Sequence, residues 1–263
     1  MLKFAANLAM LFNEHDLLER FRASRDFGFQ RIEIPFPYEL PPEKIKAELT
    51  ACGQILWLID LPVGGFASGD RGCACDPDKK DQFQNSLDKA LHYAELLDVG
   101  RLTCLVGKRL EKFSFDDQWR MLKDNLRYAS QRLSESGRTL LVEMLNEYES
   151  PGYFLPDSEP AARLIREVDC SNCRMQYDIY HMQLMEGNLV QTIRKHLDLI
   201  GHIQMANVPG RHQPGRGEID FQFVFSELER MDYQGVIGLE YIPYGSTIES
   251  LAWLKEMGNR AQY

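Results

Sequence analysis

The sequence predicts an α/β protein built as a (β/α)8 TIM barrel, and three observations support that fold class. Short apolar runs alternate along the chain with longer segments of helical periodicity. Eight such pairs in 263 residues give about 33 residues per unit, which is typical of a compact (β/α)8 barrel. The strand runs are nearly continuously apolar, as expected for parallel strands that are buried on both faces.

Each expected strand is followed by an expected helix, in chain order. The strands are expected at residues 2–7, 31–35, 55–61, 101–107, 139–145, 173–181, 200–207 and 235–243. The helices are expected at residues 14–28, 43–53, 78–100, 114–137, 158–168, 188–199, 221–231 and 247–257. Several of these helical segments open with a Ser, Asp, Asn or Thr cap and close at a glycine.

A doubly wound sheet is the alternative architecture. It would need a glycine-rich phosphate-binding turn after the first strand, and residues 7–12 contain no glycine. No linker rich in Pro or Ser and no shift in composition divides the chain. We therefore expect one barrel domain spanning residues 1–263.

The charge balance argues against two classes of partner. The chain has 39 acidic and 30 basic residues and a formal net charge of -9, which disfavours binding to nucleic acid or to an anionic membrane. The apolar stretch at residues 1–12 is too short to span a bilayer and has no signal cleavage site. Neither Cys73 with Cys75 nor Cys170 with Cys173 has further ligands at zinc-site spacing. We expect a cytoplasmic protein with reduced cysteines.

Oxygen-bearing side chains interrupt the last four predicted strands near their carboxyl ends. They are Glu143, Asp178, Gln204 and Glu240. In a barrel these ends form the mouth where active sites lie. Carboxylates buried together need a neutralising partner, and three carboxylates with one amide oxygen suit a hard divalent cation, Mg²⁺ first and Mn²⁺ second. A metal site is therefore predicted, whereas a single such residue would more simply be a solvated strand-end group.

Histidines and arginines near the predicted mouth are candidate substrate contacts. His181 follows Asp178 by three residues and is favoured for the site, while His202 could equally be a core histidine. Arg211 lies in a loop rich in Gly and Pro after the seventh strand. Arg71 lies in a glycine-rich loop after the third strand, and a structural salt bridge is the competing interpretation of this residue.

Several longer stretches resemble one known family. The run FAANLAMLFNEHDLLERF, the loop GDRGCAC, the stretch CLVGK, the run QYDIYHMQLMEG and the block VPGRHQPGRGEIDF are similar to hydroxypyruvate isomerase, a member of the xylose-isomerase-like barrels. The similarity spans nearly the whole chain. The motifs do not separate hydroxypyruvate isomerases from 2-oxo-tetronate isomerases.

The resemblance implies a set of roles for the candidate residues. The metal would be held by Glu143, Asp178, Gln204 and Glu240, and Glu143 and Glu240 would donate and accept the proton. His181 and Arg211 fall where related enzymes hold substrate oxygens. The chain departs from the usual pattern at residues 143–146, at residues 206–211, and at Asp60, where relatives usually have Asn. These departures bear on substrate preference.

The reaction that this resemblance implies interconverts hydroxypyruvate and 2-hydroxy-3-oxopropanoate through a cis-enediolate, without an organic cofactor. The expected partner is a small anionic 2-keto-hydroxy acid, bound near Arg211 and Arg71. A 2-oxo-tetronate isomerase and a ketose 3-epimerase acting on a neutral sugar are the alternative enzymes. A metal-dependent endonuclease and a non-catalytic binding protein belong to other classes. The sequence leaves the oligomeric state open, a homo-oligomer included.

Overall fold

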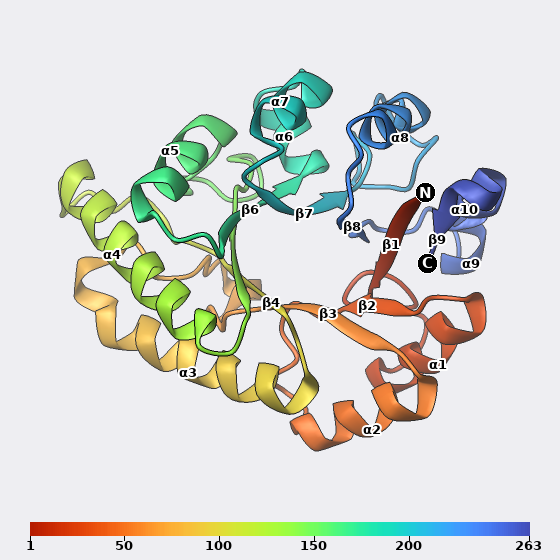
Figure 1. Ribbon diagram of the computed structural model, residues 1–263, viewed down its shortest axis with the longest axis horizontal. Coiled ribbons are helices and arrows are strands. Elements are labelled where there is room, and N and C mark those ends of the chain that lie inside the picture. The colour runs from red at the N-terminus through yellow and green to blue at the C-terminus, as the bar shows by residue number, and fades with distance from the viewer.

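The computed structural model describes residues 1–263 and has eight parallel strands closed into a barrel with helices around it (Figure 1). The strands are β1 (Leu2–Asn7), β2 (Arg31–Glu33), β3 (Ile55–Asp60), β4 (Arg101–Cys104), β5 (Thr139–Glu143), β6 (Cys173–Asp178), β7 (Ile200–Met205) and β8 (Val236–Leu239). The barrel closes because β1 pairs in parallel with both β2 and β8. The predicted (β/α)8 TIM barrel is confirmed.

Helices cover the outside of the barrel. They are α1 (Leu17–Phe27), α2 (Pro42–Cys52), α3 (Lys80–Leu97), α4 (Phe115–Ser134), α5 (Ser158–Val168), α6 (Ile179–Met185), α7 (Leu189–His196), α8 (Phe221–Arg230), α9 (Thr247–Ser250) and α10 (Ala252–Met257). A two-residue strand, β9 (Ala261–Gln262), pairs with the start of β1, so the two ends of the chain lie side by side (Figure 1). None of these helices combines the length and the apolar character needed to cross a membrane.

Several predicted elements were wrong in their extent. The expected strand at residues 173–181 ends at Asp178, because the Asp178 carboxylate accepts a hydrogen bond from the Tyr180 backbone N–H (2.7 Å) and so caps α6. The expected helix at residues 247–257 is divided at Leu251 into α9 and α10. Most other strands are shorter than predicted at their carboxyl ends, where buried apolar residues continue into the loops.

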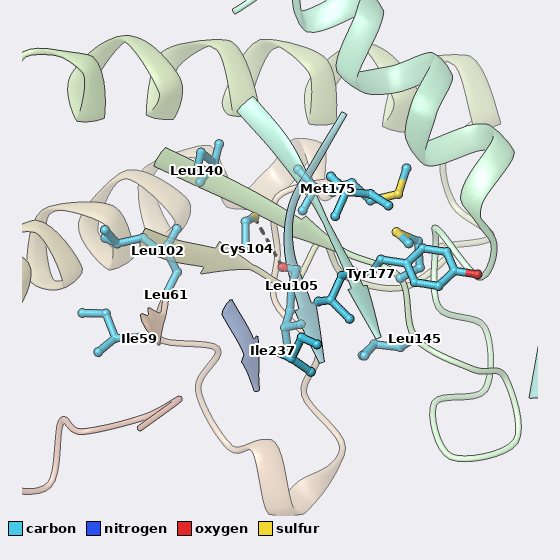
Figure 2. Packing of buried hydrophobic residues seen from close by; sticks show 14 of the residues in the cluster. Ile59, Leu61, Leu102, Cys104, Leu105, Leu140, Leu145, Met175, Tyr177 and Ile237 are labelled. Carbon is cyan, nitrogen blue, oxygen red and sulfur yellow. Dashed lines mark hydrogen bonds between the residues drawn. The ribbon is translucent and has the colours of Figure 1, made fainter. Parts of the chain in front are cut away.

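The buried hydrophobic residues form one connected core between the barrel and its helices. Figure 2 shows part of it, with Leu102, Leu140 and Met175 contributed by the neighbouring strands β4, β5 and β6. Cys104 belongs to this core, and all six cysteines are free thiols. Because every barrel strand runs in the same direction, all the carboxyl ends meet at one rim.

Candidate active site

Four neighbouring strands bring the predicted polar residues to this rim. Glu143 and Asp178 are the last residues of β5 and β6, and Glu240 directly follows β8. Gln204, the penultimate residue of β7, pairs in register with Asp178. The alignment of parallel strands therefore places these residues together, although they are far apart in the sequence.

A cavity of about 340 Å³ opens among the loops that follow the strands. Its polar lining consists of Asp60, Arg71, Glu143, Glu149, Ser150, His181, Arg211 and Glu240. Asp178 and Gln204 are fully buried and lie outside this lining. The volume is at the lower end of the range for ligand pockets and suits a small molecule.

Glu143, Asp178 and His181 form the most compact group of potential metal ligands. One ligand atom from each lies within 4.8 Å of the others, and all three side chains are buried. His181 is on the first turn of α6, and its Nε2 is 3.6 Å from Asp178 Oδ2. The cap that Asp178 provides to α6 therefore also fixes the position of His181 relative to the carboxylates.

The hydrogen bonds of His181 indicate which ring nitrogen carries the proton. Its Nδ1 accepts from the Asn146 backbone N–H (3.2 Å), so the proton of the neutral ring is on Nε2. Burial lowers the pKa of His181 well below its usual range, and the positive charges of Arg211 and Arg71 lower it further. The ring is therefore a neutral N–H donor toward the cavity, which suits contact with a substrate oxygen better than metal ligation.

Arg211 contacts two of the carboxylates, those of Glu240 and Asp178. Its Nη2 donates to Glu240 Oε2 at 2.6 Å and lies 3.4 Å from Asp178 Oδ2. The guanidinium also lies over the Tyr180 ring, 4.9 Å from the ring centre. Asn7 Nδ2 donates to Glu240 Oε1 at 3.1 Å, so both carboxylate oxygens of Glu240 have partners. These contacts hold Glu240 at the wall of the cavity.

The buried carboxyl groups of Glu143, Glu240 and Asp178 are harder to ionise than carboxyl groups in water. Burial raises the pKa of Glu143 well above its usual range, and the charges of Glu240 and Asp60 raise it further. Burial likewise raises the pKa of Glu240 well above its usual range and raises that of Asp178, although Arg211 lowers both. Clusters of perturbed acids of this kind are characteristic of functional sites.

Gln204 belongs to a buried network that the sequence did not reveal. Its Nε2 donates to Glu33 Oε2 (3.0 Å), and its Oε1 accepts from Gln176 Nε2 (2.6 Å). His202 Nε2 lies 2.7 Å from Glu33 Oε1 inside the barrel. The sequence singled out Gln204 and His202 but not their shared partner, Glu33, an acidic residue within an apolar strand.

Arg71 lines the cavity without forming an ion pair. Its Nε donates to Ser150 Oγ (2.8 Å), and its Nη1 donates to the carbonyl oxygens of Phe66 and Asp70. The guanidinium lies over the Phe66 ring at 4.1 Å. The positive charge therefore remains available to an anion, and the competing salt-bridge interpretation of this residue was wrong.

The donor set fits a divalent cation. The carboxylate oxygens of Glu143, Asp178 and Glu240 are ligands that hard cations prefer, whereas the amide oxygen of Gln204 would first have to give up its hydrogen bond from Gln176. The raised pKa values of the buried acids are the electrostatic signature of a group that lacks a counter-charge. The chemistry of these residues therefore suits the predicted metal.

Comparison with known proteins agrees with the fold. Residues 21–257 match the family model described as "Xylose isomerase-like TIM barrel". Hydroxypyruvate isomerase of Escherichia coli (strain K12) is 41% identical over 254 residues, which cover 97% of this chain and 98% of that protein. The 2-oxo-tetronate isomerase of Cupriavidus necator is 35% identical over 255 residues, with 97% and 98% covered.

A solved structure is similar throughout. The crystal structure titled "AP endonuclease, family 2" from Brucella melitensis superposes with a TM-score of 0.94 at 38% identity, covering 97% of this chain and 99% of that chain. The fold, the rim of buried acids and these matches define an enzyme of the isomerase class. The chain belongs to the xylose isomerase-like TIM barrel family.

Proposed function

We propose that this protein is a metal-dependent isomerase of small 2-oxo-3-hydroxy acids that interconverts hydroxypyruvate and 2-hydroxy-3-oxopropanoate. The relatives named hydroxypyruvate isomerase and 2-oxo-tetronate isomerase support this reaction type. One observation in this chain carries the proposal. Glu143 and Glu240 face a single small cavity whose wall also holds Arg71 and Arg211.

The reaction moves two protons and leaves the carbon skeleton unchanged. The C3–H bond of hydroxypyruvate breaks and a C2–H bond forms, while the hydroxyl proton passes from the oxygen on C3 to the oxygen on C2. A cis-enediolate lies between the two isomers. One carboxylate is needed to accept the carbon-bound proton and one carboxylic acid to return a proton to the neighbouring carbon.

Glu143 and Glu240 have the positions and environments for these two roles. They come from β5 and β8, line the same cavity, and have pKa values raised by burial, which brings a carboxyl group closer to the neutral pH at which proton transfer is efficient. His181 lines the cavity, and its Nε2–H could donate to a substrate oxygen and favour negative charge on it.

A divalent cation, Mg²⁺ or Mn²⁺, would be held by Glu143, Asp178, Gln204 and Glu240. When bound, it supplies Lewis-acid polarisation of the substrate oxygens and stabilises their developing negative charge. Three carboxylates and a divalent cation leave the site with a net charge of about -1. Arg211 and Arg71 supply the positive charge that an anionic substrate then needs.

The test is direct assay of the purified protein on hydroxypyruvate and on a 2-oxo-tetronate, side by side, with added Mg²⁺ or with a chelator. We expect isomerisation of at least one acid with Mg²⁺ and loss of that activity with the chelator. Turnover that is unaffected by complete metal removal would contradict the metal-dependent mechanism. Turnover of neither acid under any metal condition would contradict the proposed substrate class.

A further inference from the structure

The cavity wall contributed by the first half of the barrel is almost entirely apolar. Its apolar members are Ala9, Met10, Pro35, Phe36, Phe66 and Leu105. Asp60 and Arg71 are the two polar side chains of this part of the wall. Asp60 is the last residue of β3, which lies four strands from β7 but two strands from β5 around the barrel, so it is across the barrel from Gln204 and nearer to Glu143.

The backbone of Asp60 is held rigidly. Its N–H donates to the Pro35 carbonyl oxygen (2.6 Å), and its own carbonyl oxygen accepts from the Tyr38 hydroxyl. Ile59 and Leu61 on either side are buried in the core, as Figure 2 shows. Because side chains alternate along a barrel strand, this anchoring of Ile59 and Leu61 directs the Asp60 side chain to the interior.

One oxygen of the Asp60 carboxyl, Oδ1, lacks a hydrogen bond, and the nearby Thr103 hydroxyl only partly offsets the rise that burial causes in the pKa of Asp60. The residue is 6% exposed. The neighbouring Thr103 hydroxyl donates to Gln176 Oε1 (2.7 Å), and Arg71 donates through Nε and Nη1 to Ser150 and to carbonyl oxygens, not to Asp60. A buried polar atom without a partner is costly, and Asp60 is a residue of the cavity wall, where a ligand can bond to its carboxyl.

We propose that Asp60 is a specificity-determining residue that hydrogen bonds to the terminal hydroxyl group of a four-carbon substrate, a 2-oxo-3,4-dihydroxy acid. This inference rests on the proposed function. The oxygens on C2 and C3 of such an acid would face β5 to β8, where proton transfer occurs. The hydroxymethyl group of C4, which hydroxypyruvate lacks, extends beyond them to the wall that Asp60 interrupts.

A hydroxyl group is the partner that suits Asp60 chemically. Burial raises the pKa of Asp60 to about 8, and the negative charge of Glu33 raises it further, so the carboxyl is largely protonated at neutral pH. A hydroxyl both donates and accepts, so it pairs with this carboxyl in either protonation state. The substrate carboxylate is better placed at Arg71 or Arg211, where it meets positive charge.

The kinetic test compares Asp60→Leu and Asp60→Asn with the unmodified protein on both acids in the presence of Mg²⁺. Asp60→Leu should lower kcat/KM for the four-carbon acid by about tenfold to a hundredfold and change that for hydroxypyruvate much less. Asp60→Asn retains hydrogen-bonding atoms and should preserve most of the preference. Asp76→Asn, which alters a buried acid away from the cavity, is the matched control. Equal losses on both acids, or no loss, would overturn the proposal.

A binding measurement tests Asp60 even if neither acid is turned over. Calorimetric titration of the Mg²⁺-loaded unmodified protein with 4-hydroxy-2-oxobutanoate and with 2-oxobutanoate compares ligands that differ by the terminal hydroxyl alone. We expect the hydroxylated acid to bind about tenfold more tightly. The same affinity for both, or a preference that survives in Asp60→Leu, would refute the role of Asp60. Preferential binding without turnover would instead contradict the proposed reaction and leave Asp60 as a recognition residue.

Discussion

The two halves of the barrel mouth carry opposite kinds of side chain. The half that follows β5 to β8 gathers buried carboxylates, of which Asp178 contacts His181 and Arg211, and Glu240 contacts Arg211. The half that follows β1 to β4 presents apolar side chains to the same cavity, interrupted by Asp60 and Arg71. The proposed function and the proposed role of Asp60 would thus place proton transfer on one side of the cavity and selection of the ligand on the other.

The two halves also differ in how their charges are compensated. Glu240 and Asp178 share Arg211, and a divalent cation would neutralise the remaining charge. Asp60 has no such neighbour, and its raised pKa shows that the charged form is disfavoured. If this comparison is right, substitutions of the acids that follow β5 to β8 should remove catalysis. Substitutions of Asp60 should instead alter substrate preference and the pH dependence of stability.

The largest effect is expected for Glu143→Gln and Glu240→Gln. Each amide keeps the shape and an oxygen ligand but cannot accept a proton, so kcat should fall by at least about 10²–10⁴-fold. Metal content should be measured alongside the rate. Glu147→Gln, an exposed neighbour of the site, is the control and should retain normal kcat. Near-normal turnover by both metal-loaded variants would rule out the two-glutamate mechanism.

A smaller effect is expected from Asp178→Asn, which removes one negative charge from the predicted ligands. Mg²⁺ affinity should fall by at least about tenfold, measured as the Mg²⁺ concentration that restores half of the activity after chelation. Thermal unfolding gives a second readout, because a cation that binds only the folded state raises Tm. An unchanged Mg²⁺ requirement in this variant would exclude Asp178 as a ligand.

Arg211→Met should separate substrates by charge. Loss of the guanidinium should raise KM for a 2-oxo acid by about tenfold and have much less effect on a neutral ketose, because only the acid loses a charge-assisted hydrogen bond. Arg216→Met, in the same loop but exposed, serves as the control. A KM that rises equally for charged and neutral substrates would mean that Arg211 acts only by holding Glu240.

The smallest effect concerns the stability of Asp60→Asn. The folded-state pKa of Asp60, about 8, lies above its ordinary value of 3.8, so its contribution to stability is present below pH 4 and is lost as pH rises through 8. The unmodified protein should therefore lose stability relative to the variant as pH rises. In the absence of metal, the Tm of the variant minus that of the unmodified protein should increase by about 2–4 °C from pH 5 to pH 9. A difference that stays constant over this range would show that Asp60 is ionised normally.

The sequence predicted the second half of the mouth better than the first. Glu143, Asp178 and Glu240 interrupt apolar strands at their ends, so strand periodicity and barrel topology were enough to place them on one rim. Their chemical roles remain predictions. The start of α6 was missed because the apolar residues after Asp178 read as a continuing strand, and only the cap that Asp178 forms ends it.

The residues in the first half of the barrel mouth were harder to predict from the sequence. Glu33 pairs with Gln204 and His202 across the barrel, a contact between strands that no local pattern encodes. Asp60, two residues before Pro62, was noticeable only as a departure from the Asn that relatives usually have. The lack of a hydrogen bond at its Oδ1 became visible once the surrounding side chains were placed, because an unpaired buried atom is a property of three-dimensional packing.

The origin of the hydrogen on C2 of the product is the most direct test of the central claim. Hydroxypyruvate should be converted with Mg²⁺ in deuterium oxide, and the initial product analysed by NMR before it exchanges further. If Glu143 and Glu240 divide the removal and return of the proton, C2 of the product carries deuterium from the solvent in nearly every molecule. Product in which C2 retains the protium that left C3 would contradict the two-glutamate mechanism, because the hydrogen would then have moved without passing through two separate carboxyl groups.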